Sequence, residues 1–423
     1  MKPFEFQTPL QPAKTALHEV AARAPLTSQA LRNLRGATIL FVIAFHSSLA
    51  YLASTPPARP MTETPYRWLA FPISDGPGFL GFDIFCAWQD VYLMGLMFFL
   101  SALFTAPSLR RKGTWRFLKD RAARVVLPFI VGVVAIVPIA LYPVYLQSAP
   151  EPTLSGYLGV YFALPFVPNG PLWFLWALAA LTLGAVALCR MAPKWVDKVG
   201  EFAGPGEHAK TRLAIWAAVG VLLYEPLALA YTPFNWTNSG LFSFQSCRPG
   251  LYVLFYLAGL GVGAAGIENS LFTPEGPLAR RWRIAAISAA LTLFLWMGLT
   301  GLSMHFPSSL AAAIVADATY PLASLANTLA LLAVALRFAS RPLPWLGSAA
   351  DNAFGIYLIH YIPMVWLQYA LVGVNLPALA KFPLAFAGVL AISWTGTAAF
   401  RAATSPRRPA TTARVLSAGA PGD

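Results

Sequence analysis

The sequence predicts an all-α fold, a polytopic transmembrane helical bundle of about ten spans. Of the 423 residues, 57% are hydrophobic and only 11% are charged, whereas a soluble domain carries about 25% charged residues. Many apolar stretches reach the roughly 20 residues that a helix needs to cross a bilayer. These stretches are continuous rather than alternating, which favours helices over an outer-membrane barrel.

The apolar stretches define the expected spans. In chain order they are 36–53, 85–106, 125–147, 171–190, 213–232, 249–267, 284–303, 313–336, 351–371 and 382–401. An even number of spans places both ends of the chain on one side of the membrane. The segments on that side hold 26 of the 30 Lys and Arg residues, and the opposite side keeps only Arg59, Arg67, Arg248 and Lys381. By the positive-inside rule, both termini are therefore expected in the cytoplasm.

The chain divides into three expected parts. Residues 1–31 form a cytoplasmic N-terminal segment without a signal-peptide core, so the first span is expected to remain uncleaved. Residues 32–402 form the transmembrane domain, and 403–423 are expected to be a disordered cytoplasmic tail. The proline-rich loop near 54–84 lies on the opposite side. It is too long for a simple turn, so we expect it to form part of an external site.

Several functional classes lack support in the sequence. The net charge of +13 follows the topology, and no recognition helix or zinc-finger spacing accompanies it, so no nucleic-acid partner is expected. Cys86, Cys189 and Cys247 lack metal-ligand spacing and are expected to be buried thiols, with no metal site. The small residues of 258–266 are expected to pack helices rather than to bind a dinucleotide. No phosphate-binding loop or nucleophile elbow is present.

A histidine lies in the middle of the first expected span, eleven residues after an arginine at its mouth. Eleven residues advance a helix by about three turns, so Arg35 and His46 share one face about 16 Å apart, with Arg32 one turn earlier. An ionisable residue at this depth marks a functional site by default. The arrangement favours an anion-binding mouth joined to a buried proton acceptor. The alternatives are a structural histidine bonded between helices and arginines that only mark the cytoplasmic end.

A second basic cluster lies in the 108–124 loop. Arg121 and Arg124 are one helical turn apart just before the third expected span, and Asp120 is the one acidic residue of the loop. Guanidinium groups match phosphate geometry, so one interpretation is a cradle for a polyphosphate. Positive charge facing anionic lipid is the more common explanation of such a loop.

Polar residues inside the other spans indicate a cavity. Gln89 and Asp90 lie about two turns inside the second span, and Glu225 lies in the fifth. Tyr357 and His360 share a face of the ninth span because they are three residues apart. A structural hydrogen bond explains each residue singly. Together they imply a polar substrate cavity, because exposing these side chains to lipid is too costly.

Five short motifs, in this order, resemble the membrane acyltransferase 3 family and in particular its glucans biosynthesis protein C type branch. The first is Leu31–Gly36 followed by Phe45-His46, similar to the family's Arg-x10-His pattern. The others are Met97–Ser101, Arg121–Arg124 with Pro128, Gly170–Trp176 and Gly355–His360. Ala102 stands where the family pattern has a glycine. The resemblance covers about residues 31–401, and Trp173 of the fourth motif is assigned to the substrate cavity.

The resemblance implies an enzyme of the bacterial inner membrane. It would transfer an acetyl or succinyl group from acyl-coenzyme A to a hydroxyl of a carbohydrate, such as a periplasmic glucan or another envelope glycan. Acyl-coenzyme A would be a donor substrate, with no permanently bound cofactor and with the lipid bilayer as the remaining partner.

The resemblance also implies roles for individual residues. The donor phosphates would bind Arg32, Arg35, Arg121 and Arg124, and Arg35 and His46 would be catalytic. His46 would act either as a general base on the acceptor hydroxyl or as an acylated nucleophile. The alternative function is a transporter or flippase of an acylated or glycan intermediate, without covalent chemistry.

Overall fold

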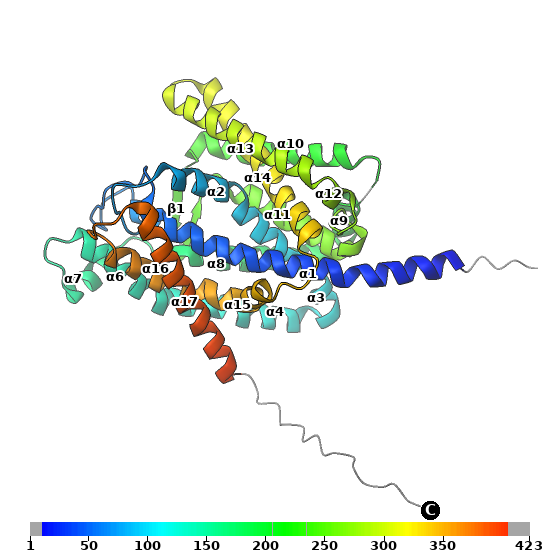
Figure 1. Ribbon diagram of the computed structural model, residues 1–423, viewed down its shortest axis with the longest axis horizontal. Coiled ribbons are helices and arrows are strands. Elements are labelled where there is room, and N and C mark those ends of the chain that lie inside the picture. Colours follow the sequence, from blue (N-terminus) through cyan, green and yellow to red (C-terminus); the bar gives the residue numbers. More distant parts are fainter. Residues whose placement is uncertain (1–10, 205, 234, 405–423) are drawn as a thin grey trace, which may run out of the picture.

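The computed structural model describes residues 11–204, 206–233 and 235–404, and almost all of its regular structure is helical (Figure 1). The long helices are α1 (Gln11–Ser48), α2 (Leu80–Ala102), α8 (Trp173–Met191), α10 (Ala209–Tyr231), α11 (Pro249–Ala265), α13 (Trp282–His305), α14 (Leu310–Phe338) and α17 (Ala378–Thr404). The all-α fold expected from the sequence is confirmed.

Shorter elements extend or connect these helices. They are α3 (Thr105–Lys112), α4 (Thr114–Arg121), α5 (Leu127–Val131), α6 (Val137–Ser148), α7 (Leu154–Ala163), α9 (Pro193–Phe202), α12 (Pro277–Arg280), α15 (Pro344–Ile359) and α16 (Tyr361–Ala370). Short 3-10 turns are η1 (Leu49–Tyr51), η2 (Arg67–Leu69), η5 (Gly170–Leu172) and η6 (Ile267–Asn269). The π-helical turns η3 (Ala122–Val126) and η4 (Gly132–Ile136) join α4, α5 and α6 into one segment. Strands β1 (Trp236–Ser239) and β2 (Phe242–Gln245) form an antiparallel hairpin in which Trp236 pairs with Gln245.

Eight helical segments of the described chain are long and apolar enough to cross a membrane, and they coincide with eight of the ten expected spans. The other two expected spans are also helical. One is α11, with 17 residues, and the other consists of α15 and α16, which are interrupted at His360. The first apolar segment begins at Leu26, earlier than expected, because α1 runs without a break through Arg32 and Arg35.

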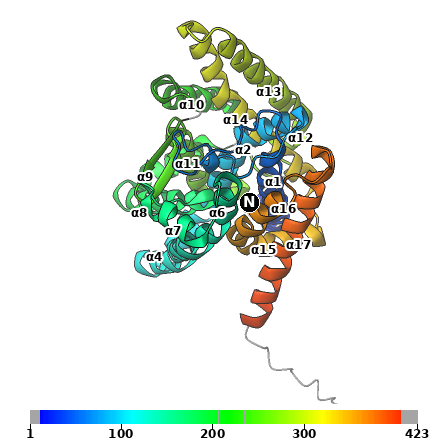
Figure 2. The ribbon, with the colours of Figure 1, turned by 90° about the vertical axis from the view of Figure 1, so that its left-hand side faces the viewer.

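Helix α1 lies between two groups of helices (Figures 1 and 2). Helices α10 and α13 lie on one side together with part of α14, and α17 lies on the other. The most extensive packing is of α13 along α14, of α1 along α15 and of α2 along α11. Ile43 of α1 and Tyr92 and Phe98 of α2 are fully buried in the core. Leu291 and Phe294 of α13 are exposed, as apolar side chains that face lipid would be.

The small residues of 258–266 lie where helices approach most closely. Gly259 and Gly263 of α11 face the backbone oxygens of Phe99 and Leu103, so any larger side chain at either glycine would collide with that backbone. Gly261 faces the backbone of α9 in the same way. The stretch therefore packs helices, as the sequence predicted.

The loop 54–84 folds onto the ends of the helices. Lys381, in the first turn of α17, pairs with Asp75 of the loop at 2.7 Å, and both side chains are buried. Ser74 and Gln147 exchange two hydrogen bonds, which attach the loop to the end of α6. The loop is therefore a fixed cap over this end of the bundle.

The first and last helices meet at Asp351 of α15. Arg32 of α1 pairs with the Asp351 carboxylate at 2.7 Å, and Arg401 of α17 donates to the Asp351 carbonyl oxygen at 2.7 Å. The early part of α1 and the last turn of α17 thus lie at one end of the bundle, which we call the basic end. The expected tail falls, from residue 405 onward, outside the described residues, as do residues 1–10.

Candidate active site

His46 lies near the end of α1 and is half-buried. Its Nδ1 is 2.8 Å from the carbonyl oxygen of Val42, one turn earlier in the same helix. Because a carbonyl oxygen can only accept, Nδ1 must carry a proton, and in the neutral ring this leaves the lone pair on Nε2. The backbone of α1 therefore fixes both the tautomer and the orientation expected of a proton acceptor.

His360 places a second imidazole beside His46. The two ring centroids are 5.1 Å apart, and the ring planes are inclined by 52°. His360 Nδ1 is 2.6 Å from the carbonyl oxygen of Tyr357, so it too is the donor, and Nε2 is again the free acceptor. His360 is fully buried, and its Nε2 has no hydrogen-bond partner. Leaving a buried acceptor without a partner is costly, so Nε2 is available to accept a hydrogen bond.

Gln368 of α16 completes this cluster, although the sequence analysis did not single it out. Its Nε2 donates to the backbone carbonyls of His46 at 2.9 Å and Ser47 at 3.2 Å, while its Oε1 is buried without a partner. The Ser47 hydroxyl is likewise buried and unpartnered. Helical periodicity could have indicated Gln368, because it follows Tyr361 by seven residues and therefore lies on the same helical face.

Tyr357 joins this cluster to the segment Gly170–Trp176. The Tyr357 hydroxyl donates to the carbonyl oxygen of Pro171, and its ring lies 5.9 Å from that of His360. Trp173 follows Pro171 by two residues, and its ring centroid lies 5.6 Å from that of Tyr252 of α11, with the ring planes inclined by 33°. Within the ranges that the structure describes, Trp173 is therefore linked to the cluster only through the backbone of Pro171, and it makes no ring contact with His46.

Asp90 is engaged by a residue that the sequence analysis assigned only to a loop. Arg248 donates to both carboxylate oxygens of Asp90, at 2.7 and 2.5 Å, and is almost fully buried. The Arg248 guanidinium also lies 4.6 Å from the centroid of the Tyr320 ring. This pairing already uses both carboxylate oxygens of Asp90. The assignment of Asp90 to the substrate cavity therefore stays a prediction.

Gln89 and Glu225 occupy different positions. Gln89 is fully buried in α2, and neither its amide nitrogen nor its amide oxygen has a partner. Both carboxylate oxygens of Glu225 are buried and unpartnered in α10, a helix that packs on α14 and α11. Within the part of the chain that the structure describes, no hydrogen bond or ring contact joins Glu225 to His46 or His360.

Arg32 and Arg35 lie on the face of α1 that packs on α15. Arg32 pairs with Asp351 and also approaches the Gly347 carbonyl at 3.4 Å. Arg35 is exposed and donates through Nη2 to the Ala350 carbonyl at 3.1 Å, leaving its charge without a carboxylate contact among the described residues. Because α1 is continuous, Arg35 is about 16 Å from His46 along the helix axis, as the sequence predicted.

Arg121 and Arg124 are separated by the start of a π-helical turn. Such a turn holds more residues than an α-helical one, so the two side chains do not lie directly above each other. Arg121 is half-buried with its guanidinium 5.2 Å from the Phe117 ring, and Arg124 is exposed. Asp120, the acidic residue of this loop, pairs instead with Lys112. In the described ranges, no hydrogen bond or ion pair connects Arg121 or Arg124 with Arg32 or Arg35.

The cysteines are dispersed. All three are free; Cys86 and Cys247 are buried and Cys189 is partly exposed. Cys86 lies 3.1 Å from the Ser48 hydroxyl. Among the described residues there is no group of three or more His, Cys, Asp or Glu side chains that could hold a metal ion.

The family model described as "Acyltransferase domain" matches residues 28–398, which is most of the chain. The chain therefore belongs to this acyltransferase family, and the protein is a membrane acyltransferase. Comparisons with curated proteins and with solved structures found no match.

Proposed function

We propose that the protein transfers an acetyl or succinyl group from acyl-coenzyme A to a hydroxyl of a carbohydrate, such as a periplasmic glucan or another envelope glycan. This would place it with the glucans biosynthesis protein C type branch, in a bacterial inner membrane with both termini cytoplasmic. The observation that supports the proposal most strongly is the pair of adjacent imidazoles. His46 is on the helix that carries Arg35, and His360, at the junction of α15 and α16, places its ring 5.1 Å from the His46 ring.

In the proposed reaction, the donor phosphates bind at the basic end and the acyl thioester reaches His46. Nε2 of His46 removes the proton of the acceptor hydroxyl while the hydroxyl oxygen attacks the thioester carbonyl. The carbon–sulfur bond then breaks, the ester is formed and the thiolate of coenzyme A leaves. The proton remains on Nε2 of His46. His360 Nε2 accepts a hydrogen bond from a neighbouring hydroxyl of the carbohydrate, which orients the ring that is acylated.

The test is acyl transfer by the purified protein in lipid nanodiscs. Radiolabelled acetyl- and succinyl-coenzyme A are supplied with envelope glycans, and the products are identified by mass spectrometry. The proposal expects one labelled glycan ester for each coenzyme A released. Passage of unmodified glycan across sealed vesicles without any ester would favour the transporter instead. Label retained on His46 in the absence of acceptor would replace the general-base route by the acyl-histidine route.

We expect Arg35→Ala and Arg124→Ala each to weaken binding of acyl-coenzyme A by about 10- to 100-fold. A hydrogen bond to a charged group contributes about 1.5–3 kcal/mol, and each 1.4 kcal/mol corresponds to about tenfold in affinity. Arg190→Ala is the matched control, because Arg190 lies at the same end and donates to Thr114.

Isothermal titration with acyl-coenzyme A and with its 3′-dephospho analogue provides the measurement. Most of the difference between the variants and the unaltered protein should be lost with the dephosphorylated donor. Equal affinities in all proteins would leave only a topological role for the arginines. If Arg35 contacts the phosphate through two hydrogen bonds, Arg35→Lys should bind acyl-coenzyme A little better than Arg35→Ala does.

Fusions to a reporter that is active only in the periplasm should give no activity after Ala403 and full activity after Gly373. Gly373 precedes α17, the last span, and Ala403 lies in its last turn. The expected result follows from the excess of basic residues at the end where α17 finishes. Activity after Ala403 with none after Gly373 would reverse the proposed orientation.

A further inference from the structure

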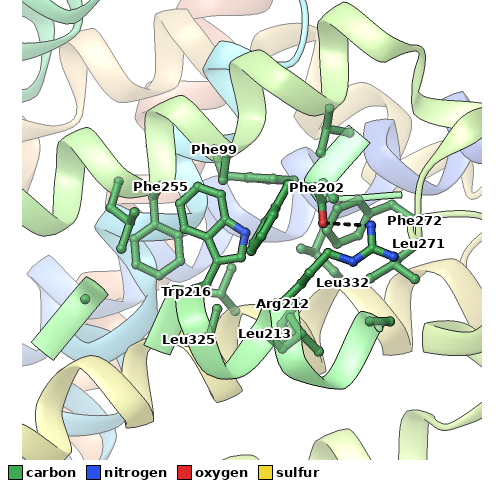
Figure 3. A pocket seen from close by; sticks show the side chains of 18 of the residues that line it. Phe99, Phe202, Arg212, Leu213, Trp216, Phe255, Leu271, Phe272, Leu325 and Leu332 are labelled. Atoms are coloured by element: carbon green, nitrogen blue, oxygen red, sulfur yellow. Dashed lines mark hydrogen bonds between the residues drawn. The ribbon is translucent and has the colours of Figure 1, made fainter. Parts of the chain in front are cut away.

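An apolar cavity lies away from the two histidines, between α9, α10, α11 and α14 (Figure 3). Its empty volume, including the part open to the surroundings, is about 750 Å³. Apart from the indole nitrogen of Trp216, only Arg212 and Thr328 bring polar side-chain atoms to its wall. Figure 3 shows Arg212 beside Phe272 and Leu271, and Phe255 at the opposite side, with Trp216 nearer to Phe255.

The cavity wall on α10 extends from Ala209 to Gly220, where an added Cβ would be in ordinary van der Waals contact with Pro321 of α14. Arg212 is eight residues earlier, near the start of α10. Eight helical residues span about 12 Å, slightly less than half of the roughly 30 Å hydrocarbon core of a bilayer. The lining residues of α10 thus extend over a length comparable to one membrane leaflet.

Arg212 holds a positive charge at the mouth of the cavity. Its Nη1 donates to the carbonyl oxygens of Glu201 at 2.8 Å and Phe202 at 3.3 Å, which fixes the guanidinium against the end of α9. Its Nε is buried without a partner. Among the described residues, no carboxylate lies within ion-pair distance of Arg212. Nη2 makes no hydrogen bond in the described part of the chain, so its N–H groups can donate to a phosphate oxygen.

We propose that this cavity binds one acyl chain of a membrane glycerophospholipid from the leaflet at the basic end, with the lipid phosphate on Arg212. Apolar walls exclude a sugar or a nucleotide from the interior, because their polar groups would be left without hydrogen-bond partners. The unpaired guanidinium selects an anionic headgroup over a neutral lipid. The bound chain fills the space between α10 and α11 and stabilises the folded bundle by mass action.

The experiment uses the full-length protein purified in mild detergent with phosphatidylglycerol and phosphatidylethanolamine. Native mass spectrometry counts the phospholipids that remain bound during detergent exchange. We expect one retained phospholipid, and we expect Arg212→Gln to bind it about 10- to 100-fold more weakly. Leu325→Trp fills the cavity and should abolish retention. Arg337→Gln is the control. It removes an exposed cation from the last turn of α14, and Arg337 does not line the cavity.

A second measurement needs no variant. A phospholipid with a photoactivatable group at the end of one chain is crosslinked to the unaltered protein, and the labelled peptides are mapped. Label on the α10 peptide with Trp216 and the α14 peptide with Leu325 supports the proposal. Label confined to the outer face of α13 would overturn it, as would equal retention in the Arg212→Gln and Arg337→Gln proteins. Displacement by palmitoyl-coenzyme A but not by excess phospholipid would assign the cavity to an acyl donor and would also overturn it.

Discussion

His46→Gln should leave the protein folded and should reduce acyl transfer by about 10²–10⁴-fold, the usual contribution of a general base. Glutamine retains a hydrogen-bonding group at this position but cannot accept a proton usefully. The fold should persist because Gln368 is bonded to the backbone carbonyl of His46, which the substitution leaves in place. Removing a neutral polar group also leaves no unpaired charge inside the bundle.

The measurement is the initial rate of ester formation at saturating donor. The thermal unfolding temperature of the same preparation shows whether the variant is folded. His46→Ala should lose transfer to the same extent as His46→Gln. His305→Ala, at the exposed end of α13, is the matched control and should be fully active. Near-normal transfer by His46→Gln would make His46 structural, and His360 would then be the base. If His46 is the base, His360→Gln should mainly raise the acceptor KM.

Lys381→Met should lower the free energy of unfolding by about 3–5 kcal/mol, because it leaves the Asp75 carboxylate buried without its partner. The side chains of Lys381 and Asp75 are 6% and 5% exposed, and their atoms lie 2.7 Å apart. The same change also releases the 54–84 loop from α17. Unfolding by denaturant in detergent micelles, monitored by tryptophan fluorescence, gives the free-energy difference.

The exposed pair Arg59–Glu63 offers a control in the same loop. Its side chains are 58% and 47% exposed, so Arg59→Met should change stability by less than about 1 kcal/mol. The double substitution Asp75→Leu with Lys381→Met removes both charges and should recover most of the loss. A Lys381→Met protein as stable as Arg59→Met would show that the buried pair contributes little.

The fold was largely predictable because the hydrocarbon core admits few backbone conformations. Hydropathy alone placed ten apolar segments, and all ten are helical. It did not indicate the π-helical turns at 122–126 and 132–136 or the interruption at His360, because these depend on how neighbouring helices pack. The hairpin β1–β2 was also missed, since strands of four residues are too short for a clear alternation of polar and apolar residues.

The candidate site was predictable only where it follows a single helix. The positions of Arg35 and His46 on one face of α1 follow from their spacing. The approach of His360 to His46 depends on the packing of α1 against α15 and α16, which no periodicity specifies. Arg248 lies in a loop, directly before α11, as expected, but counting loop cations gives no sign that the structure buries this residue against Asp90.

The hydrogen bond between Gln368 and His46 joins residues that are 322 positions apart in the chain. At a synthesis rate of about 5–20 residues per second, about 15–65 s pass between translation of the two. During that interval the first helix is already in the membrane while its polar partners have yet to leave the ribosome. Maturation of the active enzyme is therefore post-insertional, and nascent chains stopped before α15 would accumulate as inserted but inactive intermediates.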